Sequence, residues 1–201
     1  MSLRFCSRLV IEGEMCSIQP LNGEREISTE EEIKVSIKDI IRSQYHASLE
    51  MLRQAVIKCP DSLWQNRECK NMFWHISYHA LFYTHLYLQA TEEHFVPWAK
   101  HRDEYQFLGR LPWPPHREPE IAEPYSKEEI LEYHEICREQ VEEQVASLEL
   151  DAPSGFYWLP FGKLELQFYN IRHLQQHTGE LCERLGATGD IEVDWVGTKS
   201  E

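Results

Sequence analysis

Hydrophobic residues recur every three or four positions in four separate stretches of the chain. In the first stretch, Ser28 and Thr29 are each followed three positions later by a glutamate, which is the capping-box pattern of a helix start. The apolar positions behind them keep a helical period and stop before Pro60. These positions are Ile33, Ile37, Ile40, Leu49, Leu52 and Val56. The pattern predicts a first helix over residues 29–58.

A second helix is predicted from Asn71, which can serve as its N-cap, to about residue 93. Residues 71–91 contain no Asp, Glu, Lys or Arg, and their length is close to that of a bilayer span. The same stretch carries three histidines and three tyrosines, which are costly in hydrocarbon unless each has a polar partner. We therefore expect a buried helix and no membrane partner.

Two further helices are predicted in the second half of the chain. One begins at Ser126, which forms a capping box with Glu129. Its inner positions are Ile130, His134, Cys137, Val141, Val145 and Leu148. The other follows Gly162 and ends at Gly186, because glycine suits the left-handed conformation that ends many helices. Its inner positions are Leu164, Phe168, Ile171, Leu174, Leu181 and Leu185.

Together these elements predict an all-α fold, a four-helix bundle in one domain over residues 29–197. Residues 1–28 show no clear period and are interpreted as an N-terminal extension. The link between helices 2 and 3 is long and holds six of the ten prolines, and its aromatic residues predict an ordered flap. The shorter link before the fourth helix is also aromatic, so an apolar ligand is sought at these two links. The aromatic residues are Trp98, Tyr105, Phe107, Trp113, Phe156, Tyr157 and Trp158.

Charge and cysteine content narrow the function classes. The chain has 34 Asp and Glu against 20 Lys and Arg, a net charge of −14 with His neutral. Such a charge repels phosphate backbones, so no nucleic-acid partner is expected. The six cysteines lie far apart without a CxxC pair, which is typical of reduced thiols. The first fifteen residues lack the apolar run of a signal peptide, and a cytoplasmic location is expected.

The spacing of the histidines suggests a metal site. His173 and His177 are four positions apart on one predicted helix, so their rings project from one face and can bind one ion. On the second predicted helix, His79 faces inward under both framings of its apolar face, whereas His75 does so under only one. An inward imidazole needs a hydrogen bond or a metal ion. The predicted ligands are His79, His173 and His177, with His75 replacing His79 if the helix is rotated.

Other candidate residues are given structural or less specific interpretations. His134, in the inner stripe of the third helix, is interpreted as a core histidine with a hydrogen-bond partner rather than as a fourth ligand. Glu180 either orients a ligand or acts as a base, or it is an ordinary solvated glutamate of the family pattern, and these two interpretations, functional and ordinary, stay open. No cysteine has a local cationic partner that argues for a low pKa, so none is assigned as a nucleophile. The sequence therefore assigns no catalytic residue and no residue that binds an organic cofactor.

Three neutral imidazoles would leave a divalent ion with at least one open position, which is typical of a reactive site. Zinc and nickel are the first candidates, followed by ferrous iron and copper. Such an ion lowers the pKa of water toward about 7 or binds a thiol as the thiolate. Motifs of other enzyme classes are absent from the sequence, namely the ExxH pairs of di-iron bundles, HExxH, GxSxG, the P-loop and GxGxxG.

The run His173-Leu-Gln-Gln-His177-Thr-Gly-Glu-Leu, with a histidine about two turns into the second helix, resembles the DinB-like superfamily, which includes YfiT-type metal-dependent hydrolases. The resemblance covers roughly residues 29–190. It implies a four-helix bundle with a long connection between helices 2 and 3, three histidine ligands and often a homodimer. Some members use a low-molecular-weight thiol, which is therefore an implied co-substrate. The acidic charge, the proline-rich flap and the extension depart from the family pattern.

Two hypotheses of function follow. In the first, the protein is a metal-dependent enzyme in which a three-histidine metal activates a thiol or water against a small electrophilic substrate, as a thiol S-transferase or a hydrolase. In the second, it is a non-catalytic, stress-related helical bundle that holds a metal or an apolar ligand. The metal content of untagged protein bears on both hypotheses.

Overall fold

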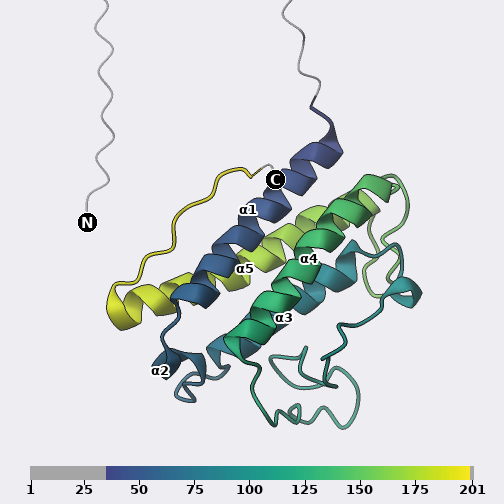
Figure 1. Ribbon diagram of the computed structural model, residues 1–201. Helices are drawn as coiled ribbons and strands as arrows, with labels where there is room; N and C mark the ends of the chain where they lie inside the picture. The colour runs from purple at the N-terminus through teal and green to yellow at the C-terminus, as the bar shows by residue number, and fades with distance from the viewer. Residues whose placement is uncertain (1–34, 200–201) are drawn as a thin grey trace, which may run out of the picture. The chain divides into compact units, whose positions relative to one another are not determined.

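The computed structural model describes residues 35–199, and within that range the chain is all-helical (Figure 1). Four long helices are joined by links that contain a short helix and a single 3-10 turn. The elements are α1 (Ile37–Lys58), α2 (Asp61–Trp64), α3 (Phe73–Leu88), η1 (Glu92–His94), α4 (Lys127–Ser147) and α5 (Lys163–Gly189). Over these residues no strand forms, and one isolated bridge joins Pro153 to Gly162. The expected all-α class is confirmed, whereas the predicted extension over residues 1–28 lies outside the described residues.

Each long helix packs against two others. The helices α1 and α3 both contact α4 and α5, while α1 and α3 contact each other little, so these two lie diagonally across the core (Figure 1). The buried apolar side chains of all four form one continuous cluster. None of the helices over residues 35–199 is both long and apolar enough to cross a membrane.

Helix α1 begins later than the sequence pattern predicted. Its N-cap is Ser36, whose hydroxyl accepts a hydrogen bond from the Asp39 backbone at 3.1 Å, while the Asp39 carboxylate accepts one from the Ser36 backbone at 3.2 Å. The predicted start at residue 29 is therefore wrong, and the boxes at Ser28 and Thr29 lie outside the described residues. The usual capping-box pattern has a glutamate or glutamine three positions after the cap, whereas this box uses Asp39, so the pattern does not identify it.

The predicted inner faces of α1 and α5 are wrong at their first turns. Ile37 and Ile40 are 42% and 45% exposed, and Ile41 is buried instead. Phe168, also predicted to face inward, is 55% exposed, because Gln167 and Asn170 face the core there through hydrogen bonds. A hydrophobicity pattern misses such positions because these amides make hydrogen bonds inside the core, Gln167 with the Tyr45 hydroxyl and Asn170 with the Thr84 carbonyl.

The ends of α3 and α5 also differ from the prediction. Helix α3 starts after Met72 rather than Asn71, and it ends at Leu88 rather than near residue 93. Just beyond this end, the carbonyls of Gln89 and Ala90 accept hydrogen bonds from the buried ammonium of Lys163, at 3.1 and 2.7 Å. These carbonyls are bonded to a side chain instead of to a further helical turn. Helix α5 passes through Gly186 to Gly189 because Asp190, with φ 52°, adopts the left-handed conformation.

Helix α4 agrees with the prediction. The capping box of Ser126 and Glu129 is present, and every predicted inner position is buried. His134 donates from Nε2 to the carbonyl of Leu49 at 3.0 Å, which confirms its interpretation as a hydrogen-bonded core histidine.

Two links are fastened to the helices and to each other. In the long link, Trp98 stacks on Tyr133 with ring centroids 4.8 Å apart, and Trp98 is 5% exposed. In the short link, the carbonyl of Ser154 also accepts from the Lys163 ammonium. Gly155, with φ +86°, lies so close to Ala90 that a Cβ atom would be 2.1 Å from its carbonyl oxygen. Both links are therefore ordered, as expected for the flap.

Candidate metal centre

The antiparallel packing of α3 and α5 sets the register of the site. At one end of this interface, Arg184 donates to the carbonyl of Asn71 at 2.7 Å. At the other end, Asn170 donates to the carbonyl of Thr84 at 3.1 Å. His79 lies between these two contacts on α3, so the register places it opposite the histidines of α5.

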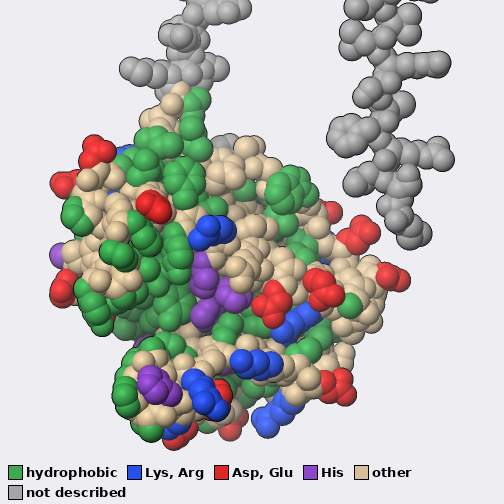
Figure 2. All heavy atoms as spheres, turned by 180° about the vertical axis from the view of Figure 1, so that it is seen from behind, with side chains coloured by type: hydrophobic (Ala, Val, Ile, Leu, Met, Phe, Trp, Pro, Cys, Tyr) green, Lys and Arg blue, Asp and Glu red, His purple; other side chains and the backbone are tan. Residues whose placement is uncertain are grey.

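The three predicted ligands converge. One ring nitrogen from each of His79, His173 and His177 lies within 4.8 Å of the other two. The Nε2 atoms of His79 and His173 are 3.1 Å apart, and the centroids of the three rings are separated by 4.7 to 5.0 Å. On the face opposite to that of Figure 1, Figure 2 shows histidine side chains gathered beside a stretch of hydrophobic ones.

Burial keeps all three rings neutral at physiological pH. It lowers the pKa of His79 well below its usual value, and the neighbouring His177 and His173 lower it further. Burial, with a contribution from His177, lowers the pKa of His173 to about 4. Burial also lowers the pKa of His177, although Glu180 opposes this shift. Neutral imidazoles are the form that binds metal ions.

Two of the rings are oriented by acceptors at their outer nitrogens. His79 donates from Nδ1 to the backbone carbonyl of Gln106 at 2.6 Å, and His177 donates from Nδ1 to the Glu180 carboxylate at 3.4 Å. Because a carbonyl or carboxylate oxygen can only accept, Nε2 of each neutral ring is left with a free lone pair. Glu180 is itself held by Arg184 at 2.6 Å. Of its two open interpretations, the contacts favour the orienting one.

The donor set fits a metal ion. Two nitrogens that share one tetrahedral zinc ion at about 2.0–2.1 Å are separated by about 3.3 Å, close to the 3.1 Å between His79 and His173. Acceptors at the outer nitrogens of metal-binding imidazoles are common and fix the tautomer. The Nδ1 atom of His173 is buried without a hydrogen-bond partner among the described residues, so this ring is the least supported of the three.

The structure separates His75 from this group. Its Nε2 donates to the carbonyl of Tyr105 at 2.8 Å, and its ring stacks on Trp74. The alternative in which His75 replaces His79 is therefore wrong, and His75 supports the long link instead.

A cavity of about 860 Å³ adjoins the three histidines, two of which, His79 and His173, form part of its wall. Most of the remaining wall is aromatic, and it comes from α3, α5 and both links. Trp113 belongs to the long link, and Tyr157 and Trp158 belong to the short one. A volume of this size is typical of small-molecule sites.

Tyr83 is a polar group of this wall that the sequence did not single out. Its ring packs edge-on against His79 and His173, with centroids 4.9 and 5.5 Å away. Burial raises its pKa, so the hydroxyl stays protonated, and it makes no hydrogen bond with another residue in the part of the chain that the structure describes. Its helical spacing of four from His79 was the only signal in the sequence.

No protein-family model matches this chain, and neither a curated protein nor a solved structure matches it. A function for the chain is therefore argued from the geometry of its own residues.

Proposed function

We propose that the protein is a metal-dependent enzyme with a DinB-like four-helix bundle, in which His79, His173 and His177 hold a divalent metal ion. The carrying observation is that three neutral imidazoles from two helices converge within 4.8 Å beside a cavity. Zinc and nickel are the first candidates because the donor set is imidazole alone, with iron and copper next. The proposed substrate is a small electrophilic molecule.

The bound ion would act as a Lewis acid that lowers the pKa of water or of a low-molecular-weight thiol, so that either attacks as a nucleophile at neutral pH. The thiol route implies a reducing compartment such as the cytoplasm. In this proposal the residues of the chain bind the substrate and orient the metal-binding histidines. Glu180 and the carbonyl of Gln106 hold the tautomers of two ligands. The aromatic wall excludes water around the substrate.

Tyr83 is the proposed hydrogen-bond donor. It stays protonated, lines the cavity and lies next to two of the histidines. A phenol in this place can donate to an oxygen of the substrate that gains negative charge during attack. A Tyr83→Phe variant should bind metal normally but lose activity, by about 100-fold if the hydroxyl acts at the reacting oxygen.

Metal content of the untagged full chain tests the proposal. The isolated protein should contain about one divalent ion, and added zinc or nickel should raise the melting temperature of metal-free protein. At a ligand concentration 100 times the dissociation constant, the stabilisation should be about 2.7 kcal/mol. A protein that neither contains nor is stabilised by any of the four metals would overturn the proposal.

The second candidate is a stress-related bundle that holds a metal or an apolar ligand without turnover. It is favoured by the high aromatic content of the cavity. Panels of thiol-plus-electrophile and ester substrates separate the two candidates. Turnover above that of free metal supports the enzyme, and metal binding with no turnover supports the binding protein.

A further inference from the structure

The cavity beside the histidines is built mainly from flat side chains. Trp113, Trp158, Tyr87 and Tyr169 contribute to its wall together with Phe82. Several of these rings contact one another, for example Tyr87 and Tyr169 with centroids 5.9 Å apart. Aromatic faces and edges favour stacked or edge-on contacts with another ring. The wall therefore suits a planar ligand better than a branched aliphatic one.

The charges around the cavity oppose an anionic ligand. Glu92 lies in its wall and is exposed, and no Lys or Arg of the described chain belongs to that wall. Arg172 lies beside it, with its guanidinium carbon 5.7 Å from the centroid of the Tyr169 ring. The whole chain carries a net charge of −14, which also repels anions.

The cavity is preformed by fixed links. Gln106 of the long link is tied to His79, and Ser154 of the short link is tied to the ammonium of Lys163. Phe107 packs edge-on against Trp113, with centroids 5.3 Å apart. Binding then requires little ordering of the chain, which lowers its entropic cost.

We propose that the cavity binds an uncharged molecule with two or more planar aromatic rings, placed between Trp113 and Trp158, with its reacting group at the wall formed by His79 and His173. Assigning this ligand as the substrate rests on the proposed function, while its binding to the cavity requires no metal. The inference thus names the substrate class of the candidate site.

A pair of fluorescent probes tests the inference on the full chain after removal of metal by a chelator, because an ion held at His79 and His173 would itself attract an anion. N-phenyl-1-naphthylamine is uncharged, and 1-anilinonaphthalene-8-sulfonate has the same rings with an added sulfonate. The uncharged probe should bind with a stoichiometry near one and at least about tenfold more tightly, a difference of about 1.4 kcal/mol. Equal or tighter binding of the sulfonate would overturn the inference.

Charge variants separate the effect of the cavity from the general hydrophobicity of the probes. A Glu92→Gln variant should bind the sulfonate more tightly by about threefold, with the uncharged probe unchanged, since one partly screened repulsion is removed. An unchanged ratio of the two affinities in Glu92→Gln would contradict the proposed charge selection. An Arg172→Gln variant should leave the affinity for the uncharged probe unchanged.

Aromatic variants locate the probe. Trp113→Ala and Trp158→Ala should each weaken the uncharged probe by about tenfold, because each removes a large contact surface. Trp195→Ala is the matched control, because Trp195 is 76% exposed and lies outside the cavity wall. All three side chains are at least 37% exposed, so the fold should persist, as circular dichroism can verify. Affinity unchanged in both cavity variants would overturn the inference.

The His79→Ala variant distinguishes this inference from the proposed function. It should lose metal and keep the uncharged probe within about threefold, because His79 forms only a small part of the wall. Probe binding in a protein that never binds metal would leave the cavity inference standing and overturn the enzyme proposal. Metal binding in a protein that does not bind the uncharged probe would overturn the cavity inference and leave the enzyme proposal standing.

Discussion

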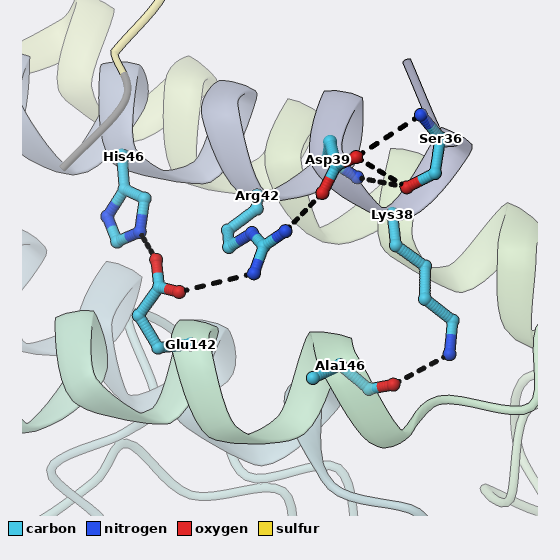
Figure 3. A network of polar contacts seen from close by, with 7 residues as sticks. All are labelled: Ser36, Lys38, Asp39, Arg42, His46, Glu142 and Ala146. Carbon is cyan, nitrogen blue, oxygen red and sulfur yellow. Dashed lines mark hydrogen bonds and ion pairs between the residues drawn. The ribbon is translucent and has the colours of Figure 1, made fainter. Parts of the chain in front are cut away.

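Two helix interfaces of this protein bury histidines, and they use them differently. In the α1–α4 interface, His46 pairs with Glu142 and His134 donates to the carbonyl of Leu49 (Figure 3 shows the His46 pair). The Glu142 carboxylate also accepts from Arg42 at 3.4 Å. In the α3–α5 interface, one ring nitrogen from each of His79, His173 and His177 lies within 4.8 Å of the other two. Both interfaces bury histidine side chains, but only in the α3–α5 interface do several of the described histidines converge on one another.

The difference shows which buried histidine is a candidate ligand. A ring with its own acceptor, such as His134, has satisfied its polar group and stabilises the packing. In the α3–α5 group, the Nε2 atoms of His79 and His173 lie within hydrogen-bond distance of each other, while the Nδ1 atom of His173 is buried without a partner among the described residues. The α3–α5 arrangement therefore leaves a buried imidazole nitrogen unsatisfied, whereas the ring of His134 has its own acceptor.

The largest expected effect contrasts one ligand with one core histidine. His79→Ala should weaken zinc binding by more than about 100-fold, or about 2.7 kcal/mol, because even partners of ligands contribute 10–100-fold. His134→Ala should leave zinc affinity unchanged while lowering stability. Isothermal titration calorimetry and urea unfolding measure the two quantities. Equal metal affinities in the two variants would remove the distinction between the interfaces.

The next effect concerns the two links that line the cavity beside the α3–α5 histidines. Gly155→Ala places a Cβ against the Ala90 carbonyl at a positive φ, so it should destabilise the protein by about 2–3 kcal/mol and weaken binding of the uncharged probe. Gly109→Ala is the control, because nothing lies within 4 Å of its added Cβ. Thermal unfolding of both variants provides the comparison. A stable Gly155→Ala variant with normal probe binding would show that the short link does not shape the cavity.

The α1–α4 interface should give a pH dependence of stability. Burial lowers the pKa of His134 to about 4 in the folded protein, below its usual 6.5. Between these values the unfolded chain binds a proton that the folded one does not, so stability is full above pH 6.5 and is lost as the pH falls toward 4. By pH 5 the loss should be about 2 kcal/mol. In a His134→Gln variant, which can still donate to Leu49, the slope of stability against pH should be shallower, and an identical slope would contradict the assignment.

The smallest expected effect compares two carboxylates, each of which contacts a histidine. Glu180→Gln should weaken zinc binding by about tenfold, or about 1.4 kcal/mol, because it removes a charged acceptor from His177. Glu142→Gln, which removes the equivalent partner of His46, should leave zinc affinity unchanged. Competition with a zinc-sensitive dye measures both. A similar loss in both variants would mean that the acidic charge of the chain, rather than the contact with His177, controls affinity.

Much of the helical layout was predictable because its signals are local. The capping box at Ser126 and the inner stripe of α4 depend on residues within a few turns of each other, and both are present. The predicted start of α1 was wrong because several Ser and Thr residues precede the helix in the sequence, and Ser36 is the one that caps it within residues 35–199. The prediction that Phe168 faces inward was wrong because the adjacent residue, Gln167, has its side-chain amide buried in the core instead.

Sequence alone determined which residues could meet, since a spacing of four places His173 and His177 on one face of any helix. Only the tertiary structure decided that His79 rather than His75 joins them, because the choice depends on the register between α3 and α5. It also decided that the carbonyl of Gln106 orients His79 and that two links enclose a cavity. These contacts join residues far apart in the chain, and no local pattern records such pairings.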